Sequence, residues 1–366
     1  MTQLKSVQAL RAIAALAVML AHLQGLENQM TGGGQLLASV WIAGVSGVDL
    51  FFVISGFIMV WVAGDWAPGA HSSLKFMFSR ILRIYPLWWL FAGVTAAYFL
   101  VSSGLPWDKD IVREADGPMH LLKSFLLVPQ QSPPVLTLGW TLIHEMYFYI
   151  IFALILLLPV KIRKPAFIVW AVIIAASTTL QLTGFTPNSL LSLALFPLTL
   201  EFLMGSAVAW LVLAGVSRFA WAALAAGLCA LVFAIITVDF TVASTIQPTH
   251  RMLAYGPAYA LIVYGLVALE RRGALDKVLP AKLVTIGDWS YSLYLSHILV
   301  ITAIARLFFP TFDTAGPIDN LAFLILASAA AIAISGLTYN FFEKPIVNRA
   351  RIARQQLFSP GEASRK

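Results

Sequence analysis

The stretch L-R-A-I-A-A-L-A-V-M-L-A-H-L, residues 10–23, decides the fold class, because it is apolar apart from Arg11 and His22. An ionisable side chain in a membrane-length apolar segment is costly and by default marks function. The two residues are eleven positions apart, which in a helix is about three turns plus roughly 20° and ~16 Å along the axis. We therefore predict a transmembrane helix that presents a cation and an imidazole on one face.

The whole chain has the composition of a polytopic membrane protein. Of its 366 residues 60% are hydrophobic and 11% are charged, with a mean hydropathy of +0.84, whereas a soluble domain carries about 25% charged residues. This excludes a water-soluble enzyme, and orientation in a membrane explains the net charge of +7 better than a nucleic-acid partner does. Cys229 is the single cysteine, which excludes a disulfide framework or a thiolate metal cluster. The first span lacks a small-residue cleavage site, so we expect it to be retained rather than removed as a signal peptide.

About ten segments reach the ~20-residue length that spans a bilayer. They are 6–25, 36–62, 77–102, 137–158, 165–183, 188–213, 218–238, 252–270, 283–309 and 319–342. With both termini in the cytoplasm, 19 of the 24 basic residues fall on the cytoplasmic side, as the positive-inside rule expects. The five on the outside are Lys109, Arg113, Lys123, Arg251 and Arg306. The sequence thus predicts an all-α integral membrane protein, a bundle of about ten transmembrane helices with both termini cytoplasmic.

The connections between the spans are short. The longest external one, 103–136, is polar and rich in proline, and we expect it to cover the outer mouth of a cavity. The segment after Pro345, with R-A-R-I-A-R, is typical of a basic stretch on the anionic inner leaflet. We therefore predict one transmembrane domain over 1–345 and a basic cytoplasmic tail over 346–366, with any chemistry inside the bundle or at its edges.

His22 is the candidate for acid–base work, because an imidazole titrates near neutral pH. Asp49, in the second span, is expected at a similar depth, where its carboxylate can orient the ring and stabilise the imidazolium as in a catalytic triad. The structural alternative for both is a hydrogen bond that only fixes helix packing.

Arg80 and Arg83 lie three residues apart at the cytoplasmic start of the third span. They share a helix face, and arginine binds phosphate groups well, so the pair is a candidate site for a phosphorylated donor. The alternative is an anchor that obeys the positive-inside rule.

Two further spans carry candidate side chains. Glu145 is expected about two turns inside the outer end of the fourth span, close to the expected depth of the first-span imidazole. Trp140 either stacks on a sugar ring or anchors the span at the interface. The ninth span carries Tyr291, Tyr294 and His297, which either contact substrate or form a hydroxyl-rich packing seam. For two other intramembrane charges, Glu201 and Arg306, we expect internal pairing. The sequence has no metal-ligand spacing and no nucleic-acid module.

In combination these motifs resemble the membrane acyltransferase-3 family, the integral-membrane O-acyltransferases that modify bacterial exopolysaccharides and lipopolysaccharide O-antigens. The resemblance covers about 4–343 and is strongest to the exopolysaccharide-producing branch. It rests on Arg11 with His22, D-L-F-F-V-I-S-G-F, R-I-L-R-I-Y-P, W-T-L-I-H-E-M-Y-F-Y, S-Y-S-L-Y-L-S-H and F-F-E-K-P. The resemblance implies a catalytic histidine, His22, and an arginine pair that handles acyl-CoA.

We therefore expect an enzyme of the bacterial cytoplasmic membrane that moves an acyl group, acetyl being the expected one, from cytosolic acyl-CoA to a hydroxyl of a polysaccharide or lipid-linked glycan. Asp49 or Glu145 would hold the His22 ring, Arg11 would contact the donor or act as a structural clamp, and no metal is expected. The alternative is a transporter or flippase for a lipid-linked glycan or acyl group, whose pathway would follow the helix face with Arg11 and His22. Two features favour the enzyme: the sequence has no internal repeat, and an arginine pair suited to phosphate is present at only one face of the membrane.

Overall fold

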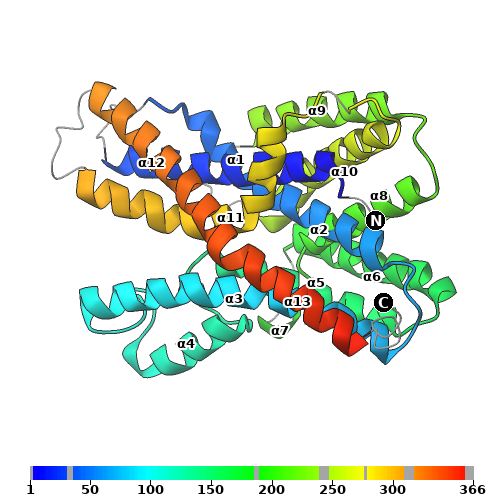
Figure 1. Ribbon diagram of the computed structural model, residues 1–366, viewed down its shortest axis with the longest axis horizontal. Coiled ribbons are helices and arrows are strands. Elements are labelled where there is room, and N and C mark those ends of the chain that lie inside the picture. Colours follow the sequence, from blue (N-terminus) through cyan, green and yellow to red (C-terminus); the bar gives the residue numbers. More distant parts are fainter. Residues whose placement is uncertain are drawn as a thin grey trace. The chain divides into compact units, whose positions relative to one another are not determined.

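The computed structural model describes residues 3–30, 36–184, 189–238, 247–275, 278–308 and 317–358, and in these ranges it contains helices and no strand (Figure 1). Among these described residues ten helical runs are long and apolar enough to cross a membrane, which confirms the predicted all-α membrane bundle. The elements are α1 (Lys5–Met30), η1 (Ser39–Ser46), α2 (Gly47–Ala63), α3 (Ala70–Ser103), η2 (Glu114–Asp116), α4 (Gly117–Leu126), α5 (Gly139–Leu156), α6 (Val160–Leu182), α7 (Ser189–Ala194), α8 (Thr199–Leu213), α9 (Ala220–Thr237), α10 (Pro248–Arg271), α11 (Ala281–Phe308), α12 (Pro317–Thr338), a π-helical turn η3 (Tyr339–Glu343) and α13 (Lys344–Phe358).

Two spans run further than the sequence pattern predicts. The third begins at Ala70, and the last continues from α12 through η3 into α13, so that one helical run covers Pro317–Phe358. The 34 residues of α3 make a helix of ~51 Å, longer than the ~30 Å hydrocarbon core. The predicted basic tail is thus helical to Phe358, and its remainder, 359–366, lies outside the described residues. The cytoplasmic location of the two termini stays a prediction.

The chain divides into two compact units, and each is described by itself. The first is Met1–Val62 with Leu200–Tyr339, and the second is Ala63–Thr199 with Asn340–Lys366. The predicted division into a domain over 1–345 and a tail over 346–366 stays a prediction.

In the first unit α1 packs along α11, and α11 packs along α12 (Figure 1). Apolar side chains of these three helices form its core, among them Met19, Leu23, Leu293, Ile301 and Phe323. Elsewhere in the unit helices meet backbone to backbone: a Cβ on Gly205 of α8 would lie 1.9 Å from the carbonyl oxygen of Val53 in α2. Small residues at such crossings let membrane helices approach closely.

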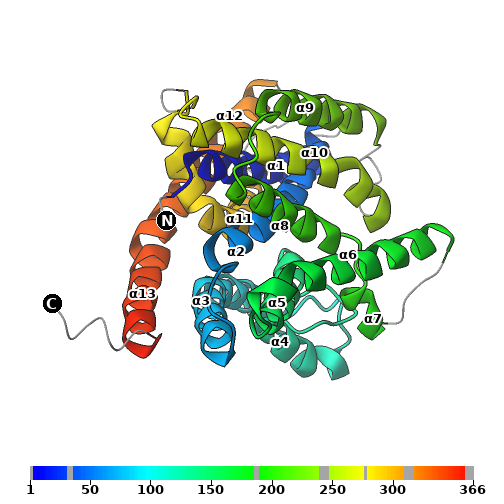
Figure 2. The ribbon, with the colours of Figure 1, turned by 90° about the vertical axis from the view of Figure 1, so that its right-hand side faces the viewer.

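In the second unit α3 lies beside α4 and α5, and α13 packs against α3 (Figure 2). Three aromatic side chains of α3 hold the end of α4 by donating hydrogen bonds to its last carbonyl groups. They are Tyr85 to Leu126, Trp88 to Ser124 and Trp89 to Phe125, at 2.8–3.0 Å. The aromatic residues at this point of α3 therefore position the segment that follows α4.

Several helices present apolar side chains to the outside, as lipid-facing helices do, and α6 and α9 are examples. On α6 (Val160–Leu182) and α9 (Ala220–Thr237) the exposed residues include Ile168, Val169, Val172, Ile173, Trp221, Leu228, Val232, Phe233 and Ile236. Such continuous apolar faces fit a bilayer rather than water.

Candidate functional site

The first unit brings two imidazoles into contact, that of His22 on α1 and that of His297 on α11. Nε2 of His297 lies 3.3 Å from Nδ1 of His22, and the ring centroids are 5.1 Å apart. Each Nδ1 also faces a carbonyl oxygen one turn earlier on its own helix, Val18 at 2.9 Å for His22 and Leu293 at 3.0 Å for His297. Helix geometry thus fixes both rings, because each is anchored to its own backbone.

The two rings differ in access. His297 is fully buried, whereas His22 is half-buried. In the described part of the chain Nε2 of His22 makes no hydrogen bond. Tyr294 lies near the buried ring, with its centroid 6.1 Å from that of His297, and Phe51 of α2 packs edge-on against Tyr294. Aromatic side chains therefore pack beside a histidine pair of which one ring is partly accessible.

Asp49 has a different partner from the one that its sequence position predicts. Its carboxylate accepts hydrogen bonds from Nε and Nη2 of Arg251 at 2.9 and 2.6 Å, and Nη2 also donates to the carbonyl of Val45. Asp49 is 0% exposed and the Arg251 side chain 15%. The orientation of His22 by Asp49 therefore stays a prediction, and in the structure it is His297 that lies against the His22 ring.

Glu201 of α8 joins this buried pair. It is fully buried and interacts electrostatically with Asp49 and Arg251. Beside it the hydroxyl of Tyr259 forms a 2.8 Å hydrogen bond with Ser46. The sequence pattern places Arg251 in an external loop, whereas the structure places it in the first turn of α10. A cation in the first turn of an apolar helix is the signal that could have identified it as a partner of an intramembrane carboxylate.

Arg11 lies on the same helix as His22, as the sequence predicts. Its Nη1 donates a hydrogen bond to the Gln8 side chain at 3.2 Å, one turn towards the start of α1. The role of Arg11 in donor binding or as a clamp stays a prediction.

The second unit holds the arginine pair on α3. The guanidinium of Arg80 lies over the rings of Phe76 and Tyr149, 5.4 and 5.7 Å from their centroids, and interacts electrostatically with Glu145 and Arg83. The hydroxyl of Tyr149 donates a short hydrogen bond to Glu145. In the part of the chain that the structure describes, Nε of Arg80 is buried without a hydrogen-bond partner. Two neighbouring cations and an unused donor make this a suitable place for an anion.

A third basic element lies beside this pair. Arg354 of α13 donates a hydrogen bond to Ser79 of α3 at 3.3 Å, and the Phe358 carbonyl lies 3.0 Å from Nε2 of His71. The basic sequence R-A-R-I-A-R is therefore packed along the first half of α3. Its predicted place on the inner leaflet stays a prediction.

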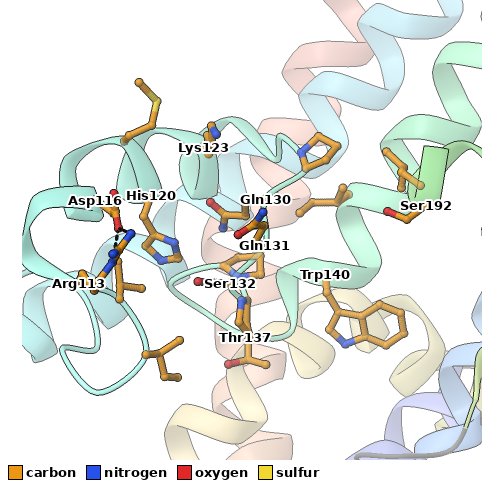
Figure 3. A pocket seen from close by; sticks show the side chains of 18 of the residues that line it. Arg113, Asp116, His120, Lys123, Gln130, Gln131, Ser132, Thr137, Trp140 and Ser192 are labelled. Atoms are coloured by element: carbon orange, nitrogen blue, oxygen red, sulfur yellow. Dashed lines mark hydrogen bonds and ion pairs between the residues drawn. The ribbon is translucent and has the colours of Figure 1, made fainter. Parts of the chain in front are cut away.

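The second unit also contains an open cavity of about 1120 Å³ (Figure 3). It lies between the predicted external connection, the start of α5 and the segment around α7. Its polar lining comprises Arg113, Asp116, His120, Lys123, Gln130, Gln131, Ser132, Thr137, Trp140, His144 and Ser192. Amide, hydroxyl and indole groups around an open space match the needs of a carbohydrate ligand.

Ser124, at the end of α4, organises the wall of this cavity. Its hydroxyl accepts hydrogen bonds from the Val135 amide at 3.0 Å and from the Gln130 side chain at 3.1 Å, and its carbonyl accepts the Trp88 indole. Burial lowers the pKa of the nearby His120 imidazole, so this ring lines the cavity in its neutral form at pH 7.

The predicted residues thus fall into two groups. The first unit holds Arg11, His22, Asp49, Tyr291, Tyr294 and His297, and the second holds Arg80, Arg83, Trp140 and Glu145. Tyr291 lies on α11 with His297. Trp140 lines the cavity as a candidate for sugar stacking should, and Glu145 is engaged with Tyr149. Their roles in catalysis and binding stay predictions.

Comparison with known proteins adds a family and two relatives. A family described as an acyltransferase domain matches residues 4–340. The exopolysaccharide production protein ExoZ of Rhizobium meliloti (strain 1021) is 32% identical over 88% of this chain and 95% of its own length. The acyltransferase MdmB of Streptomyces mycarofaciens is 28% identical over 99% of this chain and 96% of its own length. No solved structure matches the chain.

Proposed function

This chain belongs to the acyltransferase-3 family, and on that premise we propose that it transfers an acyl group, acetyl being the expected one, from acyl-CoA to a hydroxyl of a bacterial exopolysaccharide or its lipid-linked precursor. The similarity to an exopolysaccharide production protein supports a polysaccharide acceptor. Ten apolar helices support a reaction at a membrane, which we take to be the bacterial cytoplasmic membrane.

The observation that carries this proposal is the half-buried His22 ring, whose Nδ1 is held and whose Nε2 has no hydrogen-bond partner among the described residues. A ring fixed at one nitrogen and accessible at the other is suited to take a proton from an attacking hydroxyl. An acyl-imidazole at the same nitrogen is the alternative route. His22 is the group that we assign to the reacting centre.

For the donor we propose a site on α3. The phosphates of acyl-CoA would bind Arg80 and Arg83, with the cations of the adjacent α13 as further support. The planar guanidinium forms two parallel hydrogen bonds to a phosphate, which suits the unused Nε of Arg80. The aromatic rings of Phe76 and Tyr149 hold this guanidinium in place.

We expect the double variant Arg80→Ala with Arg83→Ala to raise the KM for acyl-CoA at least about tenfold, because each lost charge-assisted hydrogen bond is worth about 1.5–3 kcal/mol. Initial rates of the purified protein over a range of acetyl-CoA concentrations measure this. The matched control replaces Arg272 and Lys282, two exposed cations, by alanine and leaves KM unchanged. An equal response of KM to both double variants would contradict the assignment.

For the acceptor we propose the cavity beside α4, with Trp140 as the platform on which a sugar ring stacks (Figure 3). The indole contributes a flat apolar surface, and the surrounding Gln130, Ser132 and Thr137 offer hydrogen bonds to hydroxyl groups. This is the place that the sequence predicts for a cavity at the external connection.

Trp140→Ala should raise the KM for a glycan acceptor about 3- to 20-fold with little change in the KM for acyl-CoA, because aromatic contacts of this kind are worth about 1 kcal/mol or more. Trp140→Phe should recover most of the affinity, since it keeps an aromatic face. The control Trp221→Ala removes an indole that is 63% exposed on α9 and should change neither constant. If Trp140→Ala behaves like Trp221→Ala, the cavity is not the acceptor site.

One experiment tests the function as a whole. The purified protein is mixed with radioactive acetyl-CoA in a single turnover, with and without a bacterial polysaccharide acceptor. We expect loss of label from CoA and gain of label on the glycan. Transport of a lipid-linked glycan without consumption of acetyl-CoA would instead identify a flippase.

A further inference from the structure

We propose that His297 is a positioning residue for His22: its Nε2 shares the Nδ1–H of His22 with the Val18 carbonyl, and so orients the ring with Nε2 of His22 free to act as the base and stabilises the imidazolium that forms. This inference rests on the proposed acyl transfer. It assigns to a buried neutral imidazole the role that a carboxylate has in a catalytic triad.

The tautomers follow from the backbone partners. A carbonyl oxygen only accepts hydrogen bonds, so the nitrogen that faces it carries the hydrogen. Nδ1 of His22 is 2.9 Å from the Val18 oxygen, and Nδ1 of His297 is 3.0 Å from the Leu293 oxygen. Both rings in their neutral state are therefore Nδ1–H tautomers with a lone pair on Nε2.

The contact between the rings agrees with this assignment. The lone pair on Nε2 of His297 lies 3.3 Å from Nδ1 of His22, so that one N–H is shared between His297 and the Val18 carbonyl. The reverse arrangement, with Nε2–H of His297 as the donor, would place a bare Nδ1 lone pair of His22 against the Val18 oxygen. Two acceptors facing each other are unfavourable, and this excludes the reverse direction.

Burial separates the roles of the two rings. His297 is 0% exposed and its two nitrogens are occupied by Leu293 and His22, so substrate has no free nitrogen to contact. His22 is half-buried and keeps Nε2 available. The sequence pattern groups His297 with Tyr294 as a substrate contact, whereas the geometry points to a support for His22.

The chemical step balances without any further group. The acceptor hydroxyl gives its proton to Nε2 of His22 while its oxygen attacks the thioester carbonyl carbon. The C–S bond then breaks, and the leaving CoA thiolate takes the proton from Nε2, which regenerates neutral His22. While His22 is an imidazolium, its Nδ1–H becomes a charge-assisted donor, and the hydrogen bond to His297 strengthens at the moment it is needed.

Asp49 is not available for this role in the same way. Both of its oxygens accept hydrogen bonds from Arg251, and Glu201 adds a second carboxylate to that cluster. The support of His22 by a neutral ring is therefore an alternative to the carboxylate support that the sequence predicts.

The test uses three substitutions at one position in the full-length protein. In His297→Gln the amide oxygen reaches about as far as Nε2 and restores an acceptor. In His297→Leu no acceptor remains, and in His297→Asn the shorter amide ends near the Nδ1 position. The control Ser296→Ala alters a neighbouring buried side chain whose hydroxyl has no hydrogen-bond partner among the described residues.

We expect His297→Leu and His297→Asn to lower kcat about 10- to 100-fold, because the His22 imidazolium loses a charge-assisted hydrogen bond, with both KM values within about threefold of the wild type. His297→Gln should stay within about threefold of the wild-type kcat, and Ser296→Ala should be unchanged. Melting temperatures in detergent identify any variant that fails to fold, and the Asn variant carries the test if the Leu variant unfolds.

Two results overturn the inference. One is a folded Leu or Asn variant with near wild-type kcat, and the other is a folded Gln variant as inactive as these two. Acetyl-CoA consumption by the wild-type protein distinguishes a failure of this inference from a failure of the proposed function. If wild-type protein consumes no acetyl-CoA, the acyl transfer is wrong, whereas turnover that needs His22 but not His297 contradicts only the positioning role.

Discussion

His22→Ala should lower the rate of acyl transfer at least about 10²- to 10⁴-fold while the protein remains folded. A positioned general base contributes about this factor, and loss of a covalent nucleophile costs as much or more. The ring is half-buried and bonds only its own helix and His297 among the described residues, so its removal disturbs little packing. Release of CoA from acetyl-CoA in the presence of glycan measures the rate, and a melting curve in detergent measures the fold.

The matched control is His250→Ala, which removes an exposed imidazole of the same unit. It should leave the rate unchanged. Glycan acylation by His22→Ala at a rate close to that of the wild type would exclude a reaction at this ring. A rate that falls only because the protein unfolds would show as a lowered melting temperature, which His22→Gln then checks, since it keeps a polar side chain of similar length.

The fold was predictable because membrane spans depend on a property that is local in sequence. Each apolar segment of about 20 residues is helical in the structure, the second as η1 followed by α2 and the sixth as α7 followed by α8. The end of the last span was missed because a helix does not stop where hydropathy falls. The basic residues after Pro345 continue the helix as α13 and pack on α3.

The candidate site was predictable only in part, because pairing between distant helices leaves no local signal. His22 and His297 both stand out as ionisable residues in apolar segments, but 275 positions separate them, and nothing in the sequence says that their rings meet. Asp49 stands out in the same way, whereas its partner Arg251 lies at the edge of an apolar run, where the sequence pattern predicts an external loop.

The second large effect is expected at this pair. Asp49→Ala should destabilise the protein by about 3–5 kcal/mol. The Arg251 side chain is only 15% exposed, and the substitution removes the carboxylate that balances its charge. Arg251→Ala should cost at least as much, since Asp49 and Glu201, which are both fully buried and interact with each other, would then lack the cation that interacts with both. Unfolding in detergent, followed by tryptophan fluorescence or by denaturant titration, measures both.

A double-mutant cycle distinguishes the pair from the two residues taken singly. When both partners are replaced by apolar side chains of similar size, as in Asp49→Leu with Arg251→Met, no counter-charge is left unmatched between them, and the loss should be smaller than the sum of the single losses. Glu201 interacts electrostatically with both Asp49 and Arg251. Glu201→Gln should therefore recover part of the stability that Arg251→Ala loses, and should lower the stability little by itself. Additive losses in the cycle would mean that Asp49 and Arg251 contribute through separate contacts. A coupling of about 1 kcal/mol or more, within the range for residues in direct contact, would show that one buried ionic cluster ties α2 to α10 within the unit that carries His22.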